Sequence, residues 1–96
     1  MTVTITIAFE AGEGCRDELV DAMIGVIPDT QAFDGCENIR FVESVDQPGS
    51  LLLVEDWASI EHYQRYKAWR AESETSVLSK GLVTGTPETQ VFNPLL

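Results

Sequence analysis

The chain has 96 residues, enough for one domain, and we take residues 1–96 as a single domain. Hydrophobic residues make up 44% of the chain and charged residues 23%, a globular composition that excludes disordered and collagen-like proteins. Sixteen acidic residues against six basic ones give a formal net charge of −10. Because this charge would repel a nucleic acid or an anionic membrane, we expect neither as a partner.

The first part of the chain changes from a strand-like to a helix-like hydrophobic period. Residues 2–9 alternate between large apolar side chains and threonine or alanine, which predicts a strand. In residues 15–27 apolar side chains recur every three or four positions, as at Leu19 and Met23, which predicts a helix. We expect Pro28 to end this helix, because proline lacks the amide hydrogen needed to continue it.

The middle of the chain has the pattern of a β-hairpin. Residues 36–44 and 50–57 are strand-like, and the turn signal Asp-Gln-Pro-Gly at residues 46–49 lies between them. The second of these strands contains four consecutive apolar residues, 51–54, which indicates that both of its faces are buried. Two helices in so short a chain cover only one face of a sheet. We therefore expect a second copy of the chain on the other face.

The last part of the chain predicts a second helix and a final strand. Ser59 is a favourable N-cap for a helix over residues 60–71, and residues 72–80 predict a short further helix that ends at Gly81. Residues 89–92 have the pattern of an edge strand. The resulting order, βαββαβ, predicts a ferredoxin-like α+β fold with an antiparallel sheet and both helices on one face.

The second predicted helix carries an aromatic stripe that also contains two cations. The stripe comprises Ile60, Tyr63, Tyr66, Lys67 and Arg70, with Trp69 at its edge. In one interpretation, Lys67 and Arg70 reach water or pair with an acid such as Glu55. In the other, aromatic rings line a cavity in which Arg70 or Lys67 faces an oxyanion.

Three further residues lie near this helix in the predicted fold. Phe9 and Trp57 end strands, where each either fills the core or forms a flat wall for an aromatic ligand. His62 is the single histidine, and its near-neutral titration makes it a candidate general base. The sequence shows no second catalytic partner for His62, and an exposed position beside the stripe is the alternative.

The sequence contains none of the common metal-binding, phosphate-binding or hydrolase motifs, so we expect no metal and no cofactor. Cys15 and Cys36 lack the spacing of a redox pair, and the predicted helix holds them about 20 Å apart. A disulfide needs Cα atoms within about 7 Å, so we expect two free thiols. The first residues also lack the features of a secretory signal, and we expect a cytoplasmic protein.

Three segments of the chain match a known family. They are residues 30–36 (TQAFDGC), 54–59 (VEDWAS) and 63–70 (YQRYKAWR). Over nearly its whole length the chain resembles the antibiotic biosynthesis monooxygenase family. The resemblance implies a homodimeric α+β barrel with two chains packed sheet to sheet. It also implies oxidation of a small quinol or polyphenolic aromatic by dioxygen without metal, flavin or nicotinamide.

For this chemistry the protein binds a flat aromatic, removes a phenolic proton and stabilises the anion. The candidate catalytic residues are Arg70, Tyr66 and His62. The candidate substrate-binding residues are Phe9, Trp57, Tyr63, Lys67 and Trp69.

Three other functions are considered on the same fold. Haem-degrading members of the family use an asparagine in the first strand, a tryptophan ending the third strand and a histidine in the second helix. The chain keeps Trp57 but has Lys67 at the histidine position and no asparagine in the first strand, which disfavours haem degradation. The remaining alternatives are a non-catalytic dimeric module that binds a small hydrophobic ligand, and an isomerase or cyclase.

Overall fold

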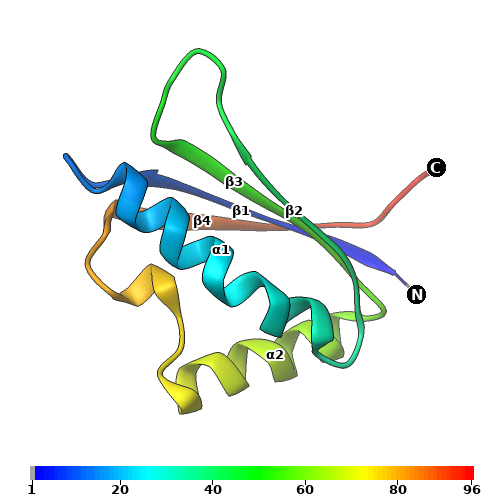
Figure 1. The fold of residues 1–96 in the computed structure, drawn as a ribbon. Helices are drawn as coiled ribbons and strands as arrows, with labels where there is room; N and C mark the ends of the chain where they lie inside the picture. The colour runs from blue at the N-terminus through cyan, green and yellow to red at the C-terminus, as the bar shows by residue number, and fades with distance from the viewer. Residues whose placement is uncertain (1) are drawn as a thin grey trace.

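The computed structural model describes residues 2–96, and its elements follow the predicted βαββαβ order (Figure 1). The elements are β1 (Val3–Ala11), α1 (Arg16–Ala32), β2 (Cys36–Glu43), β3 (Ser50–Trp57), α2 (Ile60–Ser73), the short 3₁₀ helix η1 (Val77–Ser79) and β4 (Val83–Phe92). Within the described part of the chain, no helix is both long enough and apolar enough to span a bilayer.

The four strands form one antiparallel sheet in the order β2-β3-β1-β4. β2 and β3 form the predicted hairpin, and both helices cover the same face of the sheet (Figure 1). In the register, Glu55 at the centre of β3 lies between Ile5 of β1 and Ile39 of β2. The predicted ferredoxin-like α+β fold is therefore confirmed.

The core lies between the sheet and the helices. The two-residue period of the central strands directs every second side chain under the helices. The buried strand residues are Val3, Ile5, Ile7 and Phe9 in β1 and Leu51, Leu53, Glu55 and Trp57 in β3. Leu19 and Met23 of α1, Tyr63 of α2 and Val77 of η1 close the core from the other side. Each large apolar side chain buried in this way contributes about 1.5–3 kcal/mol.

The face of the sheet opposite the helices is less covered. Leu52 and Val54 of β3 are half-buried there, Ala8 of β1 is exposed, and Phe92 of β4 keeps 45% of its surface exposed. The chain alone thus buries one face of β3, whereas the apolar run 51–54 predicts burial of both faces. The expected second copy on this face stays a prediction.

The end of α1 differs from the prediction. The helix continues through Pro28 to Ala32, rather than ending at Pro28. Pro28 itself is exposed, but Thr30 in the next turn is 2% exposed, and its hydroxyl hydrogen-bonds to Arg70 and Tyr66 of α2. These tertiary contacts stabilise the last turn and outweigh the single amide hydrogen bond that the proline removes.

Two boundaries near the C-terminus also differ. The further helix expected over residues 72–80 is reduced to the single turn η1, because α2 ends at Ser73 and Glu74 adopts a left-handed conformation with φ of 55°. β4 begins at Val83, well before the expected residues 89–92. Its pairing with β1 shifts register between Ala8 and Glu10, and this irregularity accommodates the turn-like residues 84–87 within a strand.

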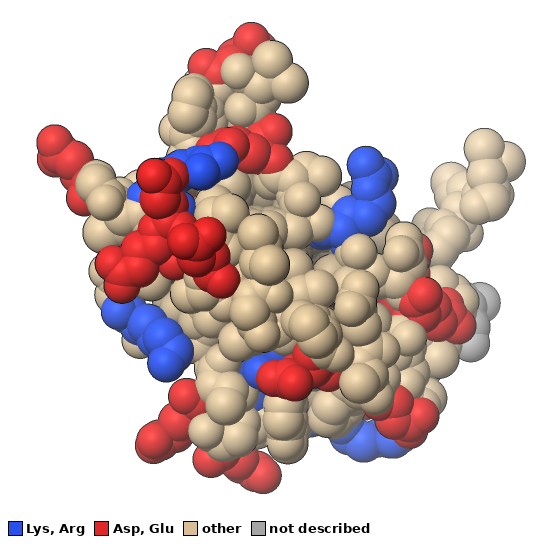
Figure 2. Space-filling model, viewed as in Figure 1, with Lys and Arg blue, Asp and Glu red and all other residues tan. Residues whose placement is uncertain are grey.

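Acidic side chains form a dense group on one part of the helix-covered face. Figure 2 shows them gathered over the N-terminal half of α1, where Asp17, Glu18 and Asp21 are exposed. The negative surface favours the approach of a neutral ligand over that of an anion.

The two cysteines, Cys15 and Cys36, are free thiols.

Candidate functional site

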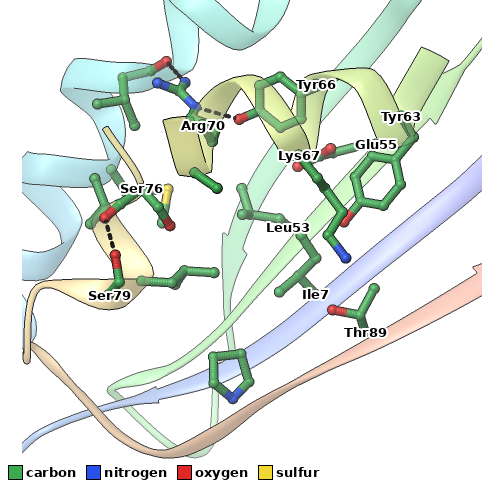
Figure 3. Close-up of a pocket in the computed structure, with 16 residues that line it drawn as sticks. Ile7, Leu53, Glu55, Tyr63, Tyr66, Lys67, Arg70, Ser76, Ser79 and Thr89 are labelled. Carbon is green, nitrogen blue, oxygen red and sulfur yellow. Dashed lines mark hydrogen bonds between the residues drawn. The ribbon is translucent and has the colours of Figure 1, made fainter. Parts of the chain in front are cut away.

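A cavity of about 350 Å³ lies between the sheet and α2 (Figure 3). Its walls are mainly apolar, from Ile7, Leu53, Met23, Val26 and Leu78. Five ionisable residues also line it: Glu55 of β3 and Tyr63, Tyr66, Lys67 and Arg70 of α2. Both the volume and the mixture of apolar walls with a few polar groups are typical of small-molecule sites.

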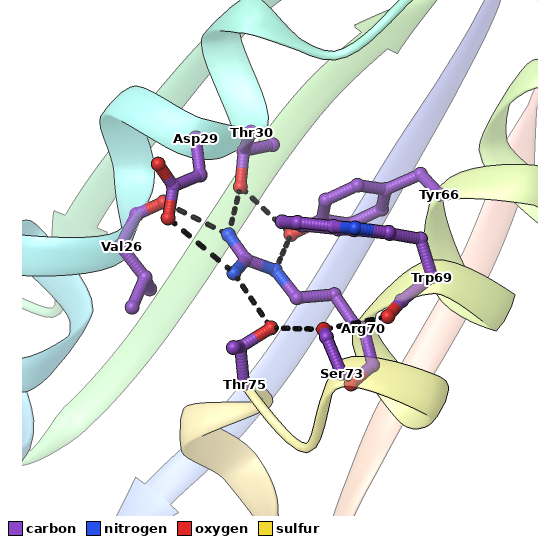
Figure 4. Close-up of polar contacts among 8 residues, drawn as sticks. All are labelled: Val26, Asp29, Thr30, Tyr66, Trp69, Arg70, Ser73 and Thr75. Carbon is purple, nitrogen blue, oxygen red and sulfur yellow. Dashed lines mark hydrogen bonds and ion pairs between the residues drawn. The ribbon is translucent and has the colours of Figure 1, made fainter.

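The guanidinium of Arg70 is held by α1 and by the end of α2, as Figure 4 shows. Arg70 is 6% exposed and donates four hydrogen bonds. The acceptors are the Tyr66 hydroxyl (2.8 Å), the Val26 carbonyl (2.9 Å), the Thr30 hydroxyl (2.9 Å) and the Thr75 hydroxyl (3.1 Å). The Asp29 carboxylate lies 3.9 Å away. Arg70 therefore makes its polar contacts with the protein.

Tyr66 belongs to the same cluster. Its hydroxyl lies 2.7 Å from the Thr30 hydroxyl in addition to accepting from Arg70. The Arg70 guanidinium carbon lies 5.2 Å from the ring centre of Tyr66 and 4.8 Å from that of Trp69. The polar ends of Arg70 and Tyr66 thus connect α2 to α1. The interpretation in which a buried cation is paired within the protein applies to Arg70, although the carboxylate near it is Asp29 of α1 and not Glu55.

Glu55 is a buried carboxyl group at the cavity wall. It is 2% exposed, and its Oε1 accepts a hydrogen bond of 2.9 Å from the indole nitrogen of Trp57. Burial raises the pKa of Glu55 above its ordinary value, while the Trp57 hydrogen bond and the charge of Arg70 act in the opposite direction. In residues 2–96 no cation lies within 4.0 Å of this carboxylate. Its charge is therefore not neutralised by an ion pair.

Lys67 and Tyr63 are two further polar residues of the cavity wall. Figure 3 shows Lys67 extending from α2 along the cavity, on the side of Ile7 and Thr89. The Lys67 amine lies 5.6 Å from the Tyr63 ring centre and has no ion-pair partner among residues 2–96. Burial raises the pKa of the Tyr63 hydroxyl far above its ordinary value, so Tyr63 stays neutral and acts as a hydrogen-bond donor.

Four of the predicted site residues do not line this cavity. Phe9 stacks on Phe41 in the core with 6.2 Å between ring centres. Trp57 is fully buried, donates a hydrogen bond to Glu55 and packs against the rings of Tyr63 and Tyr66 from behind the cavity wall. Trp69 packs against Phe33 and Arg70 on the far side of α2. The fourth is His62.

His62 lies at the start of α2, beside the loop that leads into β2. Its Nδ1 is 2.7 Å from the Ser59 hydroxyl, and its Nε2 is 3.7 Å from the Asp34 carboxylate. Ser59 also accepts a hydrogen bond from the His62 amide, so the predicted N-cap is confirmed. A side chain at Gly35 would collide with the His62 ring. These contacts give His62 a structural role at the junction.

The comparisons with known proteins bear on the whole fold. The model of the antibiotic biosynthesis monooxygenase family matches residues 2–74. The chain belongs to the antibiotic biosynthesis monooxygenase family. No curated protein matches the chain significantly.

Solved structures of similar fold come from several organisms. Rv0793 from Mycobacterium tuberculosis is 27% identical, with 99% of this chain and 96% of that chain covered and a TM-score of 0.72. SnoaB, a cofactor-independent oxygenase from Streptomyces nogalater, is 16% identical, with 99% and 94% covered and a TM-score of 0.84. A conserved protein from Methanosarcina mazei Go1 is 13% identical, with 96% and 91% covered and a TM-score of 0.85. All three share the fold.

In this antibiotic biosynthesis monooxygenase domain, Glu55 lines the cavity. From the sequence it was expected only as a possible ion-pair partner of Lys67 or Arg70. A signal for it exists in the alternation of β3, where Leu51, Leu53, Glu55 and Trp57 share the core-facing side. A carboxyl group at such a position is either paired or functional, because burying a charge without a partner is unfavourable. The small polar residues Ser76, Ser79 and Thr89 were also missed, since exposed loops and edge strands commonly contain them.

Proposed function

We propose that this chain is a cofactor-independent monooxygenase that oxidises a small quinol or polyphenolic aromatic with dioxygen. The observation that carries this proposal is an apolar cavity with ionisable groups in its wall, within a domain of the antibiotic biosynthesis monooxygenase family. In the proposed reaction, one quinol and one dioxygen yield one hydroxyquinone and one water. The substrate supplies all four electrons, so the chemistry needs no separate reductant.

Within the cavity, Lys67 takes the role of the cation that stabilises the substrate anion, because Arg70 is bound to α1. Tyr63 supplies an aromatic wall and a neutral hydroxyl donor. Arg70 and Tyr66 act as positioning residues that hold α2 against α1. A positive charge that stabilises a developing oxyanion typically contributes about 10²-fold or more in rate.

Oxygen uptake by purified protein tests this proposal. A panel of hydroquinones and polyphenols is compared with autoxidation blanks and heat-inactivated protein. We expect saturable uptake with one dioxygen consumed per quinol, and a decrease of about 10²-fold in kcat for Lys67→Met. Arg65→Met is the matched control, since Arg65 is an exposed cation of α2 outside the cavity. Uptake no faster than the blanks across the panel would contradict the proposal.

A non-catalytic module is the second candidate function. The mainly apolar cavity wall and the engagement of Arg70 and Tyr66 in structural contacts favour simple binding of a hydrophobic ligand. Saturable quinol binding without turnover would support this function. An isomerase or cyclase is distinguished by product formation under anaerobic conditions, which the oxygenase does not show.

We also propose that two copies of the chain pack sheet to sheet. The apolar patch opposite the helices, formed by Ala8, Leu52, Val54 and Phe92, supports this arrangement because a single chain leaves it partly exposed. Light scattering after size-exclusion chromatography is expected to give a dimer, and Val54→Glu a monomer. Ile24→Glu places the same charge on an exposed apolar site of α1 and should leave the dimer intact. A monomeric wild-type protein at micromolar concentration would contradict the arrangement.

A further inference from the structure

The two oxygen atoms of Glu55 have different environments. Oε1 accepts the hydrogen bond from the Trp57 indole at 2.9 Å. For Oε2, residues 2–96 provide no hydrogen-bond partner. In those residues, every polar side-chain atom that is inaccessible to solvent has a hydrogen-bond partner. Since Oε2 has none, it keeps some solvent-accessible surface. Because Glu55 lines the cavity, Oε2 is the oxygen that a ligand in the cavity reaches.

The surroundings of Glu55 leave its charge available. The neighbouring strands place Ile5 and Ile39 beside it. From α2, the titratable and charged groups that face the cavity with it are Tyr63, Tyr66, Lys67 and Arg70, and the Cys36 thiol of β2 also feels its charge. Burial, followed by the Glu55 charge, raises the pKa of Cys36 to about 11. No group in this set forms an ion pair with the carboxylate.

The other ionisable groups in the cavity wall are poor proton acceptors. Lysine and arginine side chains such as Lys67 and Arg70 are hydrogen-bond donors without an acceptor atom, and burial raises the pKa of Tyr63 and keeps its hydroxyl protonated. The Tyr66 hydroxyl already accepts from Arg70 and pairs with Thr30. His62 does not line the cavity. Among the described residues of the cavity wall, Glu55 therefore remains as the candidate proton acceptor.

We propose that Glu55 is the proton acceptor for a phenolic substrate and that Trp57 is the residue that positions it. This assignment rests on the proposed function. The phenolic O–H bond breaks, an O–H bond forms at Oε2, and the electron pair stays on the phenolate oxygen. The phenolate then reduces dioxygen, and one oxygen atom enters the ring, whose displaced C–H proton ends on the new hydroxyl. The other oxygen atom leaves as water with two protons, the one held by Glu55 and the one from the second quinol hydroxyl.

Two properties of the protein fit this step. The net charge of −10 favours entry of a neutral phenol, which must then lose its proton inside the cavity. Burial also brings the pKa of Glu55 closer to that of a phenol, about 10, which improves a carboxylate as a base toward phenols. The charge of Lys67 then has an anion to stabilise.

Glu55→Gln tests the assignment, since the amide keeps the shape and the hydrogen bond from Trp57 but accepts no proton. Oxygen uptake is measured against pH with the most active hydroquinone. We expect wild-type kcat to rise with pH as Glu55 ionises, and Glu55→Gln to lose about 10²-fold or more of kcat together with this pH dependence. Retention of wild-type kcat in Glu55→Gln would overturn the inference and leave the oxygenase standing.

Trp57→Phe tests the positioning role by a readout that folding alone does not move. Without the indole donor the ionised carboxylate is less stabilised, so the pH at which activity rises should shift upward. Trp69→Phe removes an indole that makes no contact with Glu55 and should leave this midpoint unchanged. An unchanged midpoint in Trp57→Phe would refute the positioning role.

Anaerobic binding of hydroquinone separates this inference from the oxygenase proposal. Binding is measured by the quenching of intrinsic tryptophan and tyrosine fluorescence, at several pH values, in wild type, Glu55→Gln and Glu55→Leu. We expect binding by wild type to strengthen as Glu55 ionises, and Glu55→Leu to bind more weakly with no such pH dependence. Equal binding by wild type and Glu55→Leu at every pH would overturn the inference, whether or not the wild-type protein consumes dioxygen.

Discussion

Arg70 donates a hydrogen bond from Nε to the hydroxyl of Tyr66 at 2.8 Å, one turn earlier on α2. Both residues also bind the hydroxyl of Thr30 on α1. An arginine on the core-facing side of a helix therefore has a structural explanation, because its buried charge is satisfied by four acceptors and a nearby carboxylate. The same contacts explain why Glu55 and Lys67, and not Arg70 and Tyr66, are the groups assigned to the chemistry.

Replacement of Arg70 is expected to reduce stability. Arg70→Met leaves the Val26 carbonyl and the Thr75 hydroxyl without their buried donor, and we expect a loss of about 3 kcal/mol in the free energy of unfolding. Urea unfolding followed by circular dichroism measures it. Arg65→Met, at an exposed position of α2, should change stability by no more than about 0.5 kcal/mol. An Arg70→Met protein with wild-type stability but no activity would instead indicate a direct catalytic role.

Gly35 is required by its conformation and by its contact with His62. Its φ is +93°, and an added Cβ would overlap the imidazole ring. Gly35→Ala should therefore lower the free energy of unfolding by about 2–4 kcal/mol. Gly85 is the matched control: its φ is +70°, but the space around it is open, so Gly85→Ala should lose only about 1–2 kcal/mol.

Thermal unfolding of both alanine variants separates strain from collision. Adding His62→Ala to Gly35→Ala removes the overlap with the imidazole ring and should restore part of the lost stability, whereas the overlap with the Cβ of residue 62 remains. Equal losses in Gly35→Ala and Gly85→Ala would show that the imidazole ring moves aside freely.

The ion pair between Arg16 of α1 and Glu43 of β2 should stabilise the protein in a pH-dependent manner. Glu43 accepts from Arg16 at 2.6 and 3.0 Å and from the Gly49 amide at 2.9 Å, and these bonds lower its pKa from 4.5 to about 2. A lowered pKa means that the stabilisation is fully present above pH 4.5 and is lost as the pH falls toward 2.

Urea midpoints at pH 7, 4.5 and 2.5 measure this effect. Glu43→Gln should be less stable than wild type at pH 7 and should lose less stability between pH 4.5 and 2.5. Glu72→Gln, at an exposed position of α2, should follow the wild-type curve. A Glu43→Gln curve parallel to wild type over this range would exclude the contribution.

The contribution of Glu55 to stability changes with pH in the opposite direction to that of Glu43. Because burial raises its pKa, the protonated carboxyl is favoured in the folded state, and stability is lost as the pH rises through the folded-state pKa. Glu55→Gln removes this loss, so its free energy of unfolding should exceed that of wild type at pH 8 and differ less at pH 5. Urea unfolding at both pH values checks the sign. A Glu55→Gln protein less stable than wild type at pH 8 would contradict it.

Much of the fold is predictable from local patterns in the sequence. The alternation in residues 2–9 predicts a strand and the side chains that it directs into the core, and the apolar run 51–54 predicts a second strand without distinguishing its two faces. Boundaries were less predictable where tertiary contacts compete with local preference. Pro28 lies inside α1 because the next turn is anchored through Thr30, and the turn-like residues 84–87 lie within β4 because β1 pairs on either side of them.

The sequence by itself determined the element order, the core-facing side chains of the first strand and the presence of two cations on an aromatic helix face. Only the tertiary structure decided which polar groups line the cavity. Arg70 finds acceptors on α1 at Val26 and Thr30, 44 and 40 residues earlier, and Glu55 meets the cavity from the sheet. Hydrophobic period specifies the direction of a side chain from its own element. The packing of α1 and α2 on the sheet specifies what that side chain meets, and therefore whether a charge serves structure or chemistry.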